Sequence, residues 1–185
     1  SATVNHIEYS KGGKAYSGPI YQHDVVIATV YVDKTYSDGS TETNVALTPV
    51  TLNTEEAGTF TIVDVEGLAN DPTYTVAGVT LNSISIQTAP NKTTYLEGDT
   101  FDPAGMVVMA NYNNGNSVAV TGYTLSNNTE LAAGTQTVTI SYGGQSVTQT
   151  VTVIARNNPV QISVSGNYST SVAVGEQYEF NGVVN

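Results

Sequence analysis

The side chains that could carry out chemistry are few, and their spacing does not favour catalysis. His6 and His23 are the only histidines, and the chain has no cysteine. A protein zinc site needs three or four histidine, cysteine or carboxylate ligands at short spacings, so both histidines are expected to be ordinary surface residues. A serine nucleophile needs a histidine base held by a carboxylate, and the Gly-x-Ser-x-Gly turn is absent. No catalytic or metal-binding residue is therefore predicted, and the chain is not expected to be an enzyme.

Paired carboxylates could serve either glycoside cleavage or calcium binding. Glu55 and Glu56 are adjacent, so in a strand they would point to opposite faces, whereas glycosidases hold two carboxylates across a cleft. They are expected in a solvated turn. Calcium binds hard oxygen ligands on loops, which Asp99 with Asp102 could supply.

Asp33 with Asp38 is the other pair that could contribute to calcium binding. Because aspartate is also a common turn former, structural turns are the favoured interpretation of both aspartate pairs. Calcium is kept as the minor alternative, and no cofactor is predicted.

Other polar and aromatic residues also have a structural interpretation. Residues 10–14, Ser-Lys-Gly-Gly-Lys, lack the spacing of a phosphate-binding loop and are expected to form a turn. Tyr36, Tyr112 and Tyr142 could stack on sugar rings, but half-buried packing at strand ends is favoured. A lysine–asparagine crosslink is disfavoured, since only Lys34 and Lys92 are expected to lie close to strands.

Composition excludes several partners. Five Lys and Arg against 16 Asp and Glu give a net charge of −11, which repels phosphate backbones and anionic headgroups. Neither nucleic acid nor a membrane surface is therefore an expected partner. No apolar run approaches the ~20 residues of a membrane span, and no signal peptide is visible. Because Ser1 replaces an initiator methionine, a processed or excised product is expected.

An internal repeat organises the chain. Residues 36–40, Tyr-Ser-Asp-Gly-Ser, and residues 112–116, Tyr-Asn-Asn-Gly-Asn, lie 76 positions apart. A glycine-led, threonine-containing strand follows each of these turns, with 19 positions from Gly39 to Gly58 and from Gly115 to Gly134. Matching order and spacing indicate repeated modules. The repeated residues are turn and strand formers, so the repeat predicts a framework rather than a site.

Period-two patterns predict β-strands throughout. Ile84 and Ile86 alternate with polar residues, and Val138, Ile140 and Tyr142 do the same. Val118 and Val120 are expected in one return strand, which Tyr123 and Leu125 would continue. Gly143-Gly144 is expected to form a two-residue hairpin turn. Short strands with turns every ~8–12 residues are typical of a β-sandwich, so the predicted fold is all-β.

The repeat divides the chain into two modules, at 1–79 and 80–155, and the first half of a third at 156–185. In the first module, residues 66–72 are expected to form a longer hairpin loop and a potential interaction site. Half a sandwich would leave an open edge and an unfilled core. We therefore expect the chain to be part of a longer repeat protein. Alternatively, 156–185 would pair with another subunit.

The second module resembles a known family from Leu81 to Val153. The matching elements are Gly98-Asp99-Thr100-Phe101-Asp102, Gly105-Met106-Val107-Val108, the turn at 112–115, and Tyr142-Gly143-Gly144. Together they resemble the group 3 bacterial immunoglobulin-like (Ig-like) domain. The first module resembles it loosely, with Gln22-His23-Asp24-Val25 in place of the first element. The resemblance implies tandem β-sandwiches, without catalytic residues, on exported bacterial proteins or phage virions.

Three roles follow as expectations from this resemblance. The first is a non-enzymatic structural and adhesive segment of an extracellular bacterial surface protein, which acts as a spacer and surface-interaction module. The second is an Ig-like appendage of a phage capsid or tail that binds host-surface glycans weakly. The third is an accessory module of a secreted polysaccharide-degrading enzyme. Expected partners are neighbouring modules of the same chain and a cell-surface glycan or protein.

Overall fold

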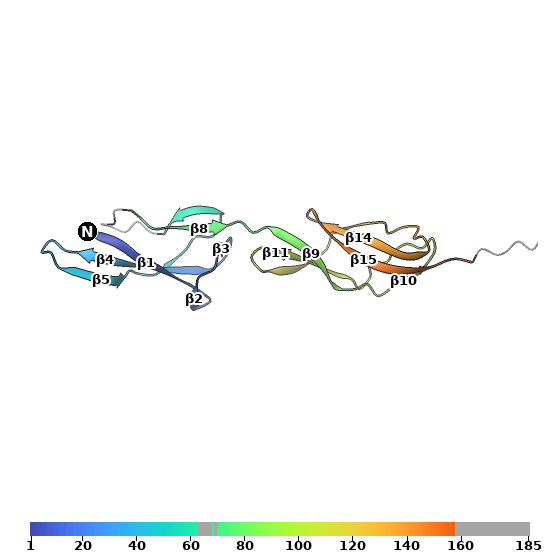
Figure 1. Cartoon of the computed structure of the whole chain (residues 1–185), viewed down its shortest axis with the longest axis horizontal. Helices are drawn as coiled ribbons and strands as arrows, with labels where there is room; N and C mark the ends of the chain where they lie inside the picture. Colours follow the sequence, from blue (N-terminus) through green and yellow to red (C-terminus); the bar gives the residue numbers. More distant parts are fainter. Residues whose placement is uncertain (63–67, 69, 158–185) are drawn as a thin grey trace, which may run out of the picture. The chain divides into compact units, whose positions relative to one another are not determined.

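The structure is a computed structural model that describes residues 1–62, 68 and 70–157 (Figure 1). Residues 1–155 form one compact unit, and 156–185 form a second unit. The predicted third module therefore lies almost wholly outside the described residues, and residues 66, 67 and 69 of the loop predicted at 66–72 also lie outside them. The described residues contain only β-strands as regular secondary structure, which confirms the all-β prediction. No helix that could cross a membrane is found among them.

The N-terminal part of this unit contains two sheets. One has the strand order β2-β1-β4-β5, with β6 also paired to β4, and the other has the order β3-β8-β7 (Figure 1). The first sheet is built from β1 (Ala2–Lys11), β2 (Lys14–Tyr16), β4 (Val26–Thr35), β5 (Thr41–Ala46) and β6 (Val50–Thr51). The second sheet is built from β3 (Ile20–Tyr21), β7 (Gly58–Thr61) and β8 (Thr73–Ala77).

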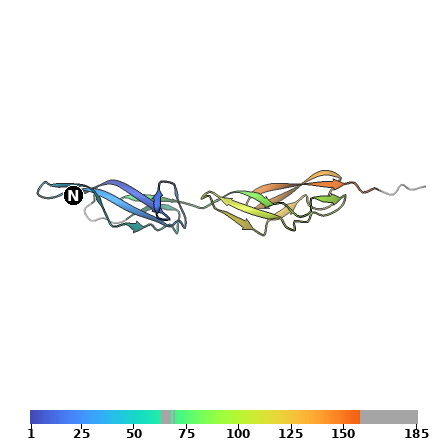
Figure 2. The same cartoon turned by 90° about the horizontal axis from the view of Figure 1, so that it is seen from below.

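The C-terminal part repeats this arrangement. Its sheets have the orders β12-β11-β9 and β10-β15-β14-β13, and Figure 2 shows their strands from a second side. The strands of the first are β9 (Leu81–Thr88), β11 (Val107–Tyr112) and β12 (Ser117–Val120). Those of the second are β10 (Thr94–Leu96), β13 (Thr124–Ser126), β14 (Gly134–Tyr142) and β15 (Gln145–Ile154). In both parts one short strand pairs in parallel, β3 with β8 and β10 with β15.

Each part has a hydrophobic core of its own, to which both of its sheets contribute side chains. In the first part, Val30 and Val32 of β4 pack with Val76 of β8. In the second part, Val108 of β11 packs with Ile140 of β14. The two cores share no residue. Because every second side chain of a strand points inward, the predicted alternation produces these cores directly.

The two repeated turns adopt the same geometry. In the first, the Tyr36 amide donates to the Ser40 carbonyl at 2.9 Å, and the Gly39 amide donates to Tyr36 at 3.1 Å. The corresponding bonds of Tyr112 to Asn116 and Gly115 to Tyr112 have the same lengths. The third loop position has φ of +84° in both turns, which glycine tolerates and most residues do not. The sequence repeat is therefore a structural repeat.

A second repeated device is an aspartate turn at the end of the short parallel strand. The Asp24 carboxylate accepts the Tyr21 amide at 2.9 Å, and the Asp99 carboxylate accepts the Leu96 amide at 3.0 Å. A lysine approaches each aspartate, Lys11 at 2.7 Å and Lys92 at 3.6 Å. The Asp24 side chain is only 12% exposed, so these two partners supply polar contacts that its carboxylate largely lacks from water.

Replacing Asp24 by alanine is expected to destabilise the first part by about 1 kcal/mol, because a charge-assisted cap of an amide and an ion pair are both lost. Urea unfolding followed by tyrosine fluorescence measures the change. Glu55→Ala is the matched control, since this exposed carboxylate lies 3.6 Å from His23 on the surface. Equal losses in both variants would contradict the role given to Asp24.

Two sequence predictions were wrong in detail. Tyr123 and Leu125 do not continue the strand of Val118 and Val120, because the chain changes sheets at Gly122, where φ is +80°. The prediction that only Lys34 and Lys92 lie near strands also fails: Lys11 ends β1 and Lys14 begins β2. The Gly143-Gly144 turn is confirmed, with φ of +55° and +80°.

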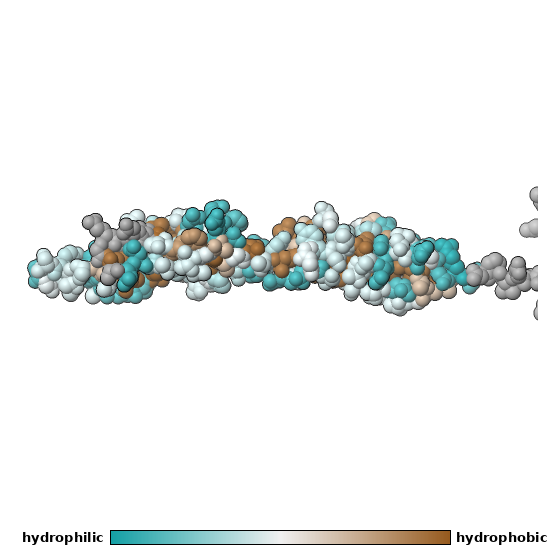
Figure 3. Space-filling view, turned by 90° about the horizontal axis from the view of Figure 1, so that it is seen from above, coloured by the Kyte–Doolittle hydropathy of each residue, from teal (hydrophilic) through white to brown (hydrophobic). Residues whose placement is uncertain are grey.

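The surface is mostly polar. Figure 3 shows small separate apolar patches among hydrophilic residues on one face. Among the described residues, the most exposed large apolar side chains are Val25 at 70%, with Val118 and Ile154 at 53% each. Scattered residues of this kind are normal for a folded protein and do not by themselves mark a binding surface.

Candidate functional site

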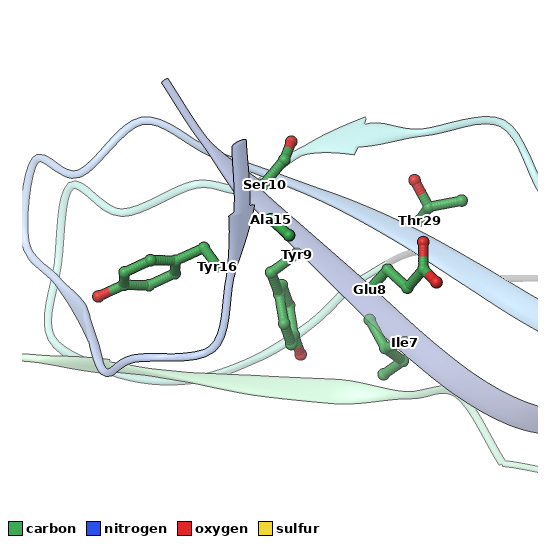
Figure 4. Close-up of a pocket in the computed structure, with 7 residues that line it drawn as sticks. All are labelled: Ile7, Glu8, Tyr9, Ser10, Ala15, Tyr16 and Thr29. Carbon is green, nitrogen blue, oxygen red and sulfur yellow. The ribbon is translucent and has the colours of Figure 1, made fainter. Parts of the chain in front are cut away.

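The candidate site is an open pocket of about 450 Å³ beside β1 and β2. Its lining residues are Ile7, Glu8, Tyr9, Ser10, Ala15, Tyr16 and Thr29 (Figure 4). Strand β2 pairs with β1 only from Tyr9 to Lys11. The pocket therefore lies where β2 ends and the outer edge of β1 loses its neighbour.

The local sequence explains this geometry. Gly12 and Gly13 have φ of +60° and +74°, which lets β1 fold back into β2 through a two-residue turn. This confirms the turn predicted within residues 10–14, at Gly12 and Gly13. The hairpin sets Tyr9 opposite Tyr16. Tyr16 is then fixed by its hydroxyl, which donates to the Pro19 carbonyl, and by Lys11, whose ammonium lies 5.2 Å from its ring centroid.

The two sides of β1 contribute different kinds of side chain to the pocket lining. Figure 4 shows Ile7 and Tyr9 on one side of the ribbon and Glu8 and Ser10 on the other, as strand alternation requires. Tyr9 packs against the first core, and burial raises the pKa of its hydroxyl. The pocket therefore combines tyrosine surface with one carboxylate and two hydroxyls.

A polar cluster adjoins Glu8 on the outer face of the sheet. The His6 ring stacks on Tyr31 with centroids 4.4 Å apart and an interplanar angle of 6°. Glu8 lies 3.5 Å from His6 Nε2 and accepts the Tyr31 hydroxyl at 3.1 Å. That hydrogen bond, followed by burial and the carboxylate charge, raises the pKa of Tyr31.

This arrangement does not assemble a hydrolase. Ser10 and His6 lie four positions apart on the same strand, so roughly 13 Å separates their backbones and a serine–histidine hydrogen bond is excluded. Glu8 is the only carboxylate among the described residues that line the pocket, whereas a glycosidase uses two. His23, the other histidine, lies 3.6 Å from Glu55 at the surface.

Asp33 and Asp38, which could have contributed to calcium binding, accept hydrogen bonds from different groups of the chain. Asp33 accepts the Asn5 side-chain amide at 3.0 Å and the Asn44 backbone amide at 2.8 Å. Asp38 accepts the Ser40 amide and hydroxyl, and these bonds lower the pKa of its carboxyl. The part of the chain that the structure describes contains no group of three or more His, Asp or Glu side chains suited to a metal ion.

The Asp99 and Asp102 pair has a comparable structural role. Asp99 caps the turn after β10 through the Leu96 amide, while the Asp102 carboxylate accepts the Ala104 amide at 3.0 Å. Both are turn interactions, as favoured from the sequence. Glu55 and Glu56 are exposed in a bend, as the solvated-turn prediction requires.

The three repeated tyrosines differ in their surroundings, and Tyr112 is half-buried at the end of β11. Tyr142 packs against the second core, in agreement with the packing prediction. Tyr36 is 44% exposed, and its hydroxyl donates to Glu42 at 2.7 Å. This hydrogen bond is the largest cause of the raised pKa of Tyr36, followed by burial and by the charge of Glu42. The pocket uses Tyr9 and Tyr16 instead. Sequence reasoning missed these two, although the Gly12-Gly13 hairpin between them was the signal that could have found them.

One segment of the chain matches a family model. Residues 88–153 match the family model described as bacterial Ig-like domain (group 3). The crystal structure of domains 4 and 5 of the S-layer protein SbsC also matches, with a TM-score of 0.40 and 15% identity over 83% of this chain and 100% of that chain. The comparison with curated proteins gives no match.

Proposed function

We propose that this chain is a non-enzymatic structural segment of a bacterial surface protein, because residues 88–153 match the family model of the bacterial Ig-like domain (group 3). Its modules serve as spacers that hold a more distal binding part away from the cell. The observation that carries the proposal is this family match within a chain whose two halves repeat one β-sandwich plan.

The nature of the repeat supports a mechanical role. What recurs between the halves is the framework: the glycine turns at Gly39 and Gly115 and the aspartate turns at Asp24 and Asp99. The pocket beside β1 does not recur in the same way, since β9 carries no hairpin partner like β2. A framework that is repeated without the pocket beside β1 suits modules added for length.

Separate cores make such addition physically simple. Because each half buries its own apolar side chains, a further module can be joined without rebuilding its neighbours. Each module adds roughly 30–35 Å if its longest strands set its length, because a ten-residue strand rises about 3.3 Å per residue. The negative charge keeps such an array soluble and apart from nucleic acid.

Two other settings remain predictions: an appendage of a phage virion that contacts glycans, and an accessory module of a secreted polysaccharide-degrading enzyme. A glycan or protein partner remains a prediction as well, and so does the absence of catalysis. The boundaries at 79 and 155 and the pairing of 156–185 in trans also remain predictions.

Location decides among the settings. Antibodies raised against this chain should label intact, unpermeabilised bacterial cells of the source, and brief protease treatment of whole cells should remove the labelling. Antibodies against a cytoplasmic enzyme give the control for lysis. Recovery of the antigen in purified phage particles, or solely in cell-free culture medium, would overturn the proposal in favour of the second or third setting.

A further inference from the structure

We propose that the linker at residues 78–80 is a stiff joint, locked by one amide side chain from each module. The inference deepens the proposed spacer role and rests on it. The two locking residues are Gln22 and Asn113. Both bind backbone groups of the linker, which the sequence alone presents as three small or apolar residues, Gly-Val-Thr.

The first module holds the linker through Gln22. Its Oε1 accepts the Val79 amide at 3.2 Å, while its Nε2 donates to the Glu55 carbonyl at 3.3 Å. The Gln22 backbone amide also donates to the Ala77 carbonyl at 3.0 Å. Gln22 is therefore fixed at its backbone and at its side chain, and it ties Val79 to the loop that contains Glu55.

The second module holds the same linker through Asn113. Its Nδ2 donates to the Gly78 carbonyl at 2.9 Å, and its Oδ1 accepts the Thr80 amide at 2.9 Å. The Asn113 backbone amide donates to the Thr80 carbonyl at 3.0 Å. One side chain thus bridges the two residues that flank Val79, using both ends of its amide group.

These hydrogen bonds restrict rotation about the backbone of residues 78–80. Gly78 is the most permissive residue of the linker, because it lacks a Cβ. Its carbonyl, the Val79 amide and both backbone groups of Thr80 are all bonded. Each bond contributes about 0.5–1.5 kcal/mol net, and rotation at the joint would have to break several of them together.

The repeat shows that Asn113 is not needed by its own turn. The corresponding position in the first module is Ser37, and the two turns have matching backbone bonds. Serine is too short to span two linker residues and has no amide with which to donate and accept at once. The turn therefore does not require the Asn113 side chain, which bonds the linker residues Gly78 and Thr80 instead.

The test uses the whole 185-residue chain, which has no native cysteine. Thr61→Cys and Thr137→Cys place two nitroxide labels at exposed, equivalent positions of the modules. Pulsed electron spin resonance then measures the distribution of distances between them. The locked joint gives one narrow distribution, and adding Gln22→Ala with Asn113→Ala should make it roughly twice as wide, because a freed linker samples many conformations.

Graded variants separate loss of the joint from loss of folding. Asn113→Asp keeps the acceptor for the Thr80 amide but loses the donor to Gly78, so an intermediate width is expected. Gln22→Ala alone leaves the second module's turn untouched and should broaden the distribution too. Asn114→Ala is the matched control, because among the described residues the Asn114 side chain bonds within the turn, where it accepts the Asn116 amide at 3.1 Å.

A broad distribution in the unaltered chain would overturn the inference, as would an unchanged width in the Gln22→Ala and double variants. Broadening by Asn114→Ala equal to that by Asn113→Asp would also overturn it, because the turn and not the linker bonds would then be responsible. These outcomes leave the spacer role standing. Failure of the whole-cell labelling would overturn the spacer role but would not bear on the proposal of a stiff linker.

Discussion

Replacing Ile140 by alanine is expected to lower the free energy of unfolding of the second module by about 2–5 kcal/mol. Ile140 has no exposed surface and packs with Val138, Val108 and Val151 from both sheets of its sandwich. Removing three of its carbons takes away buried apolar surface and leaves a cavity that tightly interlocked strands cannot close. No other single truncation proposed for this chain removes as much buried contact.

The same experiment tests the division of the chain. Because the two cores share no residue, the first module should unfold as before. Urea titration followed by residue-resolved NMR separates the two transitions. Val118→Ala is the control on β12, where a 53% exposed side chain predicts a change within about 0.5 kcal/mol. Equal destabilisation of both modules would show that they fold as one unit and contradict the boundary at 79.

Replacing Tyr95 by phenylalanine is the second large effect, expected to cost about 1–3 kcal/mol. The ring is 2% exposed and lies in the core with Phe101, at 6.0 Å between centroids. Its hydroxyl accepts the Asp102 amide at 3.0 Å and donates to the Lys92 carbonyl at 2.9 Å. Phenylalanine keeps the packing but leaves the two backbone groups without this partner, so the loss reports on the hydroxyl alone.

Tyr142→Phe provides the comparison within the same module. Tyr142 also packs against the second core, but its hydroxyl makes no hydrogen bond to the part of the chain that the structure describes. Its removal should change stability by less than about 0.5 kcal/mol. Thermal unfolding followed by circular dichroism measures both variants. A Tyr95→Phe protein as stable as the unaltered chain would contradict the stabilising role given to the hydrogen bonds of the Tyr95 hydroxyl with Lys92 and Asp102.

Much of the fold could be predicted from local patterns. The alternation of Val138 and Ile140 with threonines places one face inward, because strand side chains alternate with a period of two. The Asn-Gly pair at 114–115 and the Gly-Gly pair at 143–144 predict tight turns, because they tolerate positive φ. The family resemblance of the second module could be found from such elements in order, and the family match at 88–153 agrees with it.

The candidate site was predicted less well. Absence of a triad motif and of metal-ligand spacing can be read from residue types, and these led to the expectation of no catalytic site. The pocket beside β1 could not be predicted, because it arises from where β2 stops relative to β1. Strand length and edge position depend on pairing partners far along the chain. The stacking of His6 on Tyr31 likewise needs the register of β1 against β4.

The sequence by itself determined the all-β class, the repeat and the repeated turns, because strand periodicity and positive φ are properties of a few neighbouring residues. Tertiary structure alone decided the change of sheets at Gly122, the parallel pairing of β10 with β15, and the partners of the Tyr95 hydroxyl. It also decided that Gln22 and Asn113, 91 positions apart, bind one linker. These features join residues distant in sequence, and no local pattern fixes which distant groups will meet.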